Sequence, residues 1–110
     1  MNDLISVILP VYNGERFLAQ SIESVIAQKY DNWELVILDD CSTDATPNII
    51  QKYAKEDKRI KYYRNEQNLK LPGNLNKGFS IAKGSYLTWT SDDNKYRDNA
   101  LEKMYNVIQD

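Results

Sequence analysis

The fold is decided by residues 4–14, LISVILPVYNG, in which a short apolar run is followed directly by a turn. The run is rich in β-branched residues and lacks polar alternation, which is typical of a strand buried on both faces of a parallel sheet. We expect Pro10 to end this strand. From Glu15 to about Lys29 the apolar residues recur at helical spacing. A buried strand followed by an amphipathic helix predicts an α/β domain.

The rest of the chain repeats this alternation of strands and helices. The further predicted strands are residues 33–38, 60–64 and 85–90, and the second of these is polar enough to suit a sheet edge. Helical spacing predicts helices that start with Thr46 as N-cap, over 74–83 with Gly84 as C-cap, and through Ile108 at the end of the chain. We therefore expect a three-layer sandwich with a mostly parallel sheet, in a single domain over residues 1–110.

The composition excludes several classes of partner and compartment. The net charge is −2, from 14 basic and 16 acidic residues, so the chain lacks the positive charge that a nucleic-acid-binding surface needs. The longest apolar stretch, residues 4–11, contains Ser6 and Pro10 and is far shorter than the roughly 20 residues of a transmembrane helix. Cys41 is the only cysteine, which is typical of a protein in the reducing cytoplasm. We expect a cytoplasmic protein with no nucleic acid partner and no transmembrane segment.

The absence of histidine excludes whole reaction chemistries. Without histidine, and with a single cysteine, the chain can build no catalytic triad, zinc knuckle or iron–sulfur cluster. The four glycines form neither of the two common glycine motifs that bind phosphate. Any metal ion must then be a hard cation that carboxylate and other oxygen atoms hold.

Aromatic and acidic residues follow the predicted strands at their carboxyl ends, which is where open parallel sheets bind ligands. Tyr12 follows the first strand, Asp39 and Asp40 follow the second, and Asp92 and Asp93 follow the fourth. A flat tyrosine ring can stack on a nucleobase, and a carboxylate can accept a hydrogen bond from a base N–H. Two structural alternatives stay open at this point: Tyr12 as a packing residue, and Asp39-Asp40 as loop and capping residues.

Asp92 and Asp93 are harder to explain by structure alone. Adjacent carboxylates repel each other unless a cation or hydrogen-bond donors compensate. Successive side chains of an extended segment point in opposite directions, so one aspartate can face a bound sugar while the other faces a metal ion and a diphosphate. By contrast, the basic residues from Lys52 to Lys70 alternate with acidic ones and are interpreted as a solvated face. Cys41 is interpreted as a small packing residue.

Three blocks of sequence resemble the nucleotide-binding half of the family 2 glycosyltransferases, which have the GT-A fold. The blocks occur in the family's order and spacing and cover nearly the whole chain, so the resemblance implies a Rossmann-like nucleotide-binding domain. The first joins SVILPVYN (6–13) to SIESVIAQ (21–28), the second is ELVILDDCSTD (34–44), and the third runs from NKG (76–78) through AKGSY (82–86) to Asp92-Asp93.

The resemblance also implies roles for individual residues. Asp40 would accept a hydrogen bond from the ring N–H of uracil or thymine, with Asp39 as the less favoured substitute. Asp92 would contact the ribose, and Asp93, together with Asp92, would hold the Mg²⁺ or Mn²⁺ that bridges the diphosphate. The wall of the base pocket would be formed by Pro10, Val11, Tyr12 and Glu15.

The chain departs from the family pattern in two places. Thr90 stands where many members have an acidic residue, and Leu75 where many have an arginine. The family also continues past the acidic pair with a half that binds the acceptor and supplies a catalytic carboxylate. The catalytic base is therefore expected beyond Asp110, and the chain is expected to be a donor-binding part, truncated before the acceptor half.

The implied function is transfer of a sugar from a UDP- or dTDP-sugar to the hydroxyl of a saccharide or lipid-linked acceptor, in polysaccharide biosynthesis. The full-length protein is expected in the cytoplasm, at the inner face of the membrane. One alternative is a stand-alone nucleotide-binding module without turnover. Another is a phosphoacceptor receiver domain, which fits less well because receivers place their acidic pair after the first strand.

Overall fold

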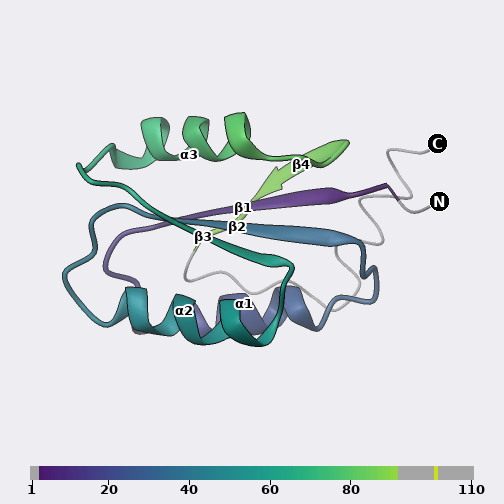
Figure 1. The fold of residues 1–110 in the computed structure, drawn as a ribbon, viewed down its shortest axis with the longest axis horizontal. Helices are drawn as coiled ribbons and strands as arrows, with labels where there is room; N and C mark the ends of the chain where they lie inside the picture. Colours follow the sequence, from purple (N-terminus) through teal and green to yellow (C-terminus); the bar gives the residue numbers. More distant parts are fainter. Residues whose placement is uncertain (1–2, 92–100, 102–110) are drawn as a thin grey trace.

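The computed structural model describes residues 3–91 and 101, and these form a parallel sheet between two layers of helices (Figure 1). The sheet order is β3-β2-β1-β4, and every neighbouring pair is parallel. Helices α1 and α2 cover one face and α3 covers the other (Figure 1). This confirms the predicted α/β fold with three layers, and β3 lies at an edge as expected. The strands are β1 (Ile5–Val11), β2 (Trp33–Asp39), β3 (Ile60–Arg64) and β4 (Tyr86–Trp89), and the helices are α1 (Leu18–Ile26), α2 (Thr46–Glu56) and α3 (Lys70–Ile81).

The apolar runs of β1 and β2 are buried because each strand contributes side chains to two cores. Alternate residues of a strand point to opposite faces of the sheet. One set, which includes Val7 and Ile37, packs with α1 and α2 in the larger core. The other set, which includes Ile8 and Leu38, packs beneath α3 in the smaller core. Every residue of β1 and of β2 is buried, which explains why neither strand shows polar alternation.

Pro10 lies inside β1 and does not end it, so that expectation was wrong. Backbone groups of alternate residues in a strand face the same neighbouring strand. The carbonyl of Ile8 accepts a hydrogen bond from the N–H of Thr90, so Pro10, two residues later, faces the same side. On that side the β1–β4 pairing has already ended, at Ile8 and Trp89. The missing N–H of proline therefore breaks no bond of the sheet.

Helix α3 begins at Lys70, four residues before the predicted start at Asn74. Pro72 and Gly73 favoured a loop in the sequence, but proline is tolerated in the first turn of a helix, where its N–H has no helical partner. Gly84 is also not the C-cap as predicted, because α3 ends at Ile81 and its C-cap is Ala82. A side chain at Gly84 would place Cβ 2.6 Å from the carbonyl oxygen of Leu4, so this glycine permits a close approach to β1.

The two remaining helix predictions differ in outcome. Thr46 is the first residue of α2 and not its N-cap, which is Ala45. The last predicted helix lies outside the described residues, except for Leu101. Leu101 is buried in the larger core, and its backbone N–H donates to the side-chain oxygen of Gln28 at 2.9 Å.

Candidate functional site

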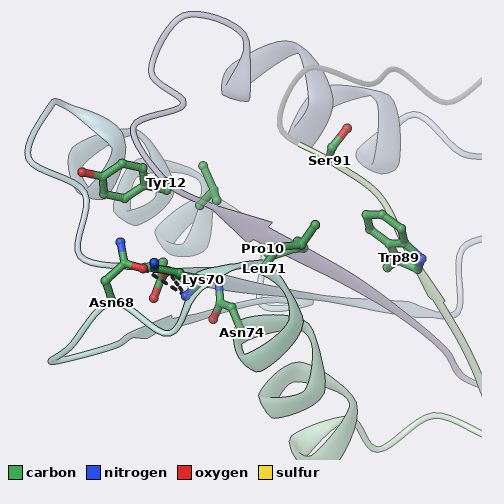
Figure 2. A pocket seen from close by; sticks show the side chains of 10 residues that line it. Pro10, Tyr12, Asn68, Lys70, Leu71, Asn74, Trp89 and Ser91 are labelled. Carbon is green, nitrogen blue, oxygen red and sulfur yellow. Dashed lines mark hydrogen bonds between the residues drawn. The ribbon is translucent and has the colours of Figure 1, made fainter.

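A pocket of about 600 Å³ opens at the carboxyl ends of β1 and β4 (Figure 2). From β1 the chain passes to β2 and β3 on one side and returns to form β4 on the other side. Ligands of open α/β sheets bind at such a point, where the strand order reverses. The pocket is lined by Pro10, Val11, Tyr12, Asp40, Asn68, Lys70, Leu71, Asn74, Trp89 and Ser91.

Asp40 presents a buried carboxylate whose position is fixed by three hydrogen bonds. Its Oδ1 accepts from the N–H of Leu69 at 2.7 Å and from the Asn65 amide at 2.9 Å. Its Oδ2 accepts from the N–H of Lys70 at 2.8 Å. A carboxylate offers about four acceptor positions, so within the described part of the chain Oδ2 keeps one of them for a ligand. A ligand N–H is the group that this remaining position favours.

Asn65 connects the Asp40 carboxylate to α3. Its buried amide group donates to Asp40 and also to Oδ1 of Asn74, at 2.7 Å. The Lys77 ammonium donates to Oδ1 of Asn65 at 2.6 Å, which fixes the orientation of the amide. Asn74 donates in turn to the carbonyl of Leu38 in β2 at 2.9 Å. This network holds the segment between β3 and α3 against the sheet and orients Asp40.

Asp39 points to the opposite face of the sheet from Asp40, because adjacent residues of a strand alternate. Its carboxylate is fully buried and forms an ion pair with Arg64 at 2.7 Å. It also accepts hydrogen bonds from the N–H of Ser42 at 3.0 Å and from the Tyr62 hydroxyl at 3.4 Å. Burial is the main reason that the pKa of the Tyr62 phenol is raised. Asp39 is absent from the pocket lining and links β2 to β3.

Tyr12 stands at the mouth of the pocket on an anchored loop. Its side chain is 53% exposed, and Figure 2 shows the ring on the same side of the pocket as Asn68. The next residue, Asn13, has a φ of 50° and is held by the β2–α2 loop. Its N–H donates to the Ser42 hydroxyl at 2.8 Å, and its side chain accepts from the N–H of Thr43 at 2.7 Å. An exposed ring on a fixed backbone suits stacking against a flat ligand.

Glu15 is exposed and is not among the residues that line the pocket. Its Oε1 accepts from the N–H of Ala45 at 3.4 Å, and its own N–H donates to Asp44 at 3.3 Å. Burial alone would raise the pKa of Asp44, but hydrogen bonds with Thr46 and Glu15 hold it below its usual value. The structure therefore places Glu15 in the contact between the β1–α1 loop and the start of α2.

Five pocket residues were missed in the sequence: Asn68, Lys70, Leu71, Asn74 and Trp89. Lys70 was interpreted as part of a solvated face, but it lines the pocket, and its N–H is bonded to Asp40. No local pattern marks Lys70, because the contact depends on how α3 returns to the sheet. Trp89 was predicted only as part of the strand over residues 85–90, and its side chain is 46% exposed at the pocket. In residues 86–90, YLTWT, Leu87 and Trp89 alternate with tyrosine and threonine, and this period of two could have indicated that both side chains lie on one face of the strand.

The acidic pair Asp92-Asp93 lies outside the described residues, whereas its neighbour Ser91 lines the pocket. Within residues 3–91 and 101, no cluster of three or more histidine, cysteine or acidic side chains could hold a metal ion. In the same part of the chain, no helix is long and apolar enough to cross a membrane. The structure thus brings Pro10, Val11, Tyr12 and Asp40 together in one pocket.

Comparison with known sequences assigns the chain to a protein family. The model of glycosyl transferase family 2 matches residues 6–110, and the chain therefore belongs to this family. Among curated relatives from Bacillus subtilis (strain 168), the putative glycosyltransferase EpsE is 44% identical over 106 residues. The putative teichuronic acid biosynthesis glycosyltransferase TuaG is 36% identical over 107 residues. These alignments cover 96% and 97% of the chain but only 38% and 42% of the two relatives.

Solved structures show the same fold. S. aureus TarS 1–349, solved in complex with UDP-GlcNAc, matches with a TM-score of 0.88 and 29% identity, over 96% of this chain and 31% of that one. The mannosyltransferase PcManGT from Pyrobaculum calidifontis, solved with GDP-Man and Mn²⁺, matches with a TM-score of 0.83 and 22% identity. The match covers 96% of this chain and 31% of the mannosyltransferase, and it supports the fold alone. The architecture is that of the GT-A glycosyltransferases.

Proposed function

We propose that this chain binds the donor in a glycosyltransferase that transfers a sugar from a UDP- or dTDP-sugar to an acceptor hydroxyl. The observation that carries the proposal is the buried, oriented carboxylate of Asp40, which keeps one acceptor position in a pocket beside the exposed ring of Tyr12. The ring N–H of uracil or thymine fits that position. The complex of the related TarS with UDP-GlcNAc supports the same donor class.

The extent of the pocket supports a bound nucleotide. A volume of about 600 Å³ lies within the range of small-molecule sites. With the base at Asp40 and Tyr12, the rest of the nucleotide extends along Pro10 toward Trp89 and Ser91, which Figure 2 shows on the far side of the pocket from Tyr12. We assign the ribose contact to Asp92, which follows Ser91 directly in the sequence.

A divalent cation, Mg²⁺ or Mn²⁺, is part of this proposal, with Asp93 and Asp92 as its ligands. Two carboxylates form the all-oxygen donor set that such hard cations prefer. The bound cation would neutralise charge on the leaving diphosphate. Ser91, which directly precedes the acidic pair in the sequence, lines the pocket and supports this assignment.

The acceptor and the catalytic base belong to the part of the proposal that concerns the whole protein. Attack of an acceptor hydroxyl requires a base that removes its proton. Asp40 is the one carboxylate among the described pocket residues. Its hydrogen bonds orient it toward the nucleobase, so we do not assign it the role of catalytic base. We propose that the base follows Asp110 and that the acceptor is a saccharide or a lipid-linked group. Activity in the cytoplasm, at the inner membrane face, is part of the same proposal.

Calorimetric titration with UDP, dTDP and ADP tests the donor class. We expect UDP and dTDP to bind at least about tenfold more tightly than ADP, because adenine has no ring N–H to offer Asp40 on its pairing edge. Asp40→Asn replaces an acceptor oxygen by an amino group and should remove this preference. Asp31→Asn, at an exposed position away from the pocket, is the matched control. Equal affinity of the unmodified chain for all three nucleotides would contradict the proposal.

A further inference from the structure

Lys70 occupies a backbone conformation that a lysine rarely adopts. Its φ is 62°, in the left-handed region where a side chain meets steric resistance and glycine does not. This strained residue lies in the pocket and begins α3. A strained backbone at a site is a reason to ask what the side chain does there.

The Lys70 ammonium has no carboxylate partner within residues 3–91 and 101. Two ion pairs occur in this part of the chain, and they engage Arg59 with Asp57 and Arg64 with Asp39. Lys77, the other cation near the pocket, donates to Asn65. Lys70 therefore brings a hydrogen-bond donor to the pocket that the described side chains leave available.

Lys70 is also bonded directly to the acceptor in the pocket. Its backbone N–H donates to Oδ2 of Asp40, which is the oxygen with one remaining acceptor position. The site thus combines an acceptor, Asp40, with a neighbouring donor, the Lys70 ammonium. Uracil and thymine present the complementary pair, a ring N–H flanked by carbonyl oxygens.

We propose that Lys70 reads the base, by donating a hydrogen bond from its ammonium to the carbonyl oxygen beside the ring N–H that Asp40 accepts. This inference rests on the proposed function and adds a specificity-determining residue to it. Cytosine and adenine place a lone pair where Asp40 needs a donor, so they fail at the first contact. Guanine has an N–H beside a carbonyl, but its additional amino group finds Oδ1 of Asp40 already occupied by Leu69 and Asn65.

Two substitutions distinguish the role of the Lys70 side chain in binding from the effect of its strained backbone on stability. Lys70→Met keeps the length of the side chain and removes its donor, and Lys70→Gly also relieves the backbone strain. We expect both variants to bind UDP about tenfold or more weakly, in line with loss of a charged hydrogen bond. Lys70→Gly should nevertheless unfold at a higher urea concentration than the unmodified chain. Lys61→Met, at an exposed position in β3, is the control for loss of one positive charge.

Ligand analogues locate the contact on the base. The Lys70→Met substitution should weaken the binding of uridine, which has no phosphate, by the same factor as the binding of UDP. The unmodified chain should bind 2-thiouridine or 4-thiouridine more weakly than uridine, because sulfur is the poorer acceptor, and Lys70→Met should not distinguish that analogue from uridine. A loss confined to UDP would overturn the inference in favour of a phosphate contact, and unchanged affinity in both variants would overturn it outright. Failure of the unmodified chain to bind any uridine nucleotide would instead refute the proposed function itself.

Discussion

Asn65 is the residue on which the geometry of the pocket most depends, although it is not part of the pocket lining. One amide donates to two acceptors, Asp40 and Asn74, and accepts from Lys77. Because Asn65 and Asn74 are both buried, the side-chain oxygen of Asn74 relies on this amide in place of water. Such a group costs more to remove than a single surface hydrogen bond, since several polar atoms lose their partner together.

We expect Asn65→Ala to lower the free energy of unfolding by about 2 kcal/mol, because it leaves Oδ1 of Asn74 without this donor in a buried site. Urea denaturation of the two proteins measures the difference. The matched control is Asn76→Ala, an exposed asparagine on α3, which should change stability by less than about 0.5 kcal/mol. Equal stability of Asn65→Ala and the unmodified chain would show that water replaces the amide.

At the scale of elements, the contact between α3 and the sheet depends on Gly78. A Cβ added there would lie 2.4 Å from Cγ2 of Ile8 and 2.8 Å from Cδ1 of Leu38. Real side chains do not approach so closely, so α3 could not keep its present distance from β1 and β2. Since Lys70 and Asn74 are carried by the same helix, this one glycine also sets how far the helical wall of the pocket stands from the sheet.

Gly78→Ala is expected to destabilise the fold by about 1–3 kcal/mol, despite the better helix propensity of alanine. Gly73→Ala, in the first turn of the same helix, would meet only Cβ of Leu69 at 3.3 Å and should be neutral or slightly stabilising. Thermal unfolding of both variants provides the comparison. Ile8→Ala removes the methyl group that the new Cβ would contact. The double variant Ile8→Ala/Gly78→Ala should therefore lose less stability than the sum of the losses in the two single variants.

Helices α1 and α2 are joined by a hydrogen bond from the Tyr53 hydroxyl to the Glu23 carboxylate. This bond, with burial as the second cause, raises the pKa of Tyr53 from 10.0 to about 12. The folded chain thus prefers the protonated phenol more strongly than the unfolded chain does. The stabilisation is complete below about pH 10 and is lost as the pH rises through about 12.

Tyr53→Phe should therefore lower the free energy of unfolding by about 1 kcal/mol at neutral pH and flatten its decline in alkaline solution. Urea denaturation at a series of pH values from neutral to about pH 11 measures both effects. Tyr63→Phe, in β3, controls for the loss of a phenol at a half-exposed position. A parallel decline of the Tyr53→Phe and unmodified curves would mean that this bond does not contribute.

Sequence patterns located both β2, which is buried along its whole length, and β3, which is mostly exposed at the sheet edge. β2 was expected over residues 33–38 and extends one residue further, and β3 has the predicted bounds of 60–64. The patterns failed where tertiary structure overrides local preference, at Pro10 within β1 and at Pro72 near the start of α3. In both places the missing N–H of proline has no partner to lose, which can be known only from the neighbouring strand or turn.

The sequence identified those site residues that lie at the carboxyl ends of the strands. Pro10, Val11, Tyr12 and Asp40 follow from strand direction, since parallel strands present their carboxyl ends at one edge. The wall that α3 and its preceding loop contribute, with Lys70 and Asn74, could not be predicted in the same way. Its position depends on the return of the chain across the sheet and on the close contact at Gly78.

At the scale of the whole molecule, the pocket brings together residues that lie far apart in the sequence, from Pro10 to Ser91. Its lining residues come from β1, the end of β2, the segment before α3, α3 itself and the end of β4. The β1 and β2 loops are tied together by Gly14 and Thr46 at 2.9 Å and by Asn13 and Ser42 at 2.8 Å. Site and fold are therefore coupled, because the contacts that hold the layers together also hold the ligand-facing groups.

The strand order has a consequence for how the protein is made. Among the described strands β1 is synthesised first, and its neighbour β4 follows only after β2, β3 and all three described helices. During translation, β1 and β2 can pair before β4 is synthesised, and the other edge of β1 then remains unpaired. That open side carries the apolar sequence of β1 and is a site for mistaken pairing with other nascent chains. Pairing of β4 with β1 covers this side, and the same event brings Trp89 and Ser91 to the pocket, so the described lining is complete only once β4 has formed.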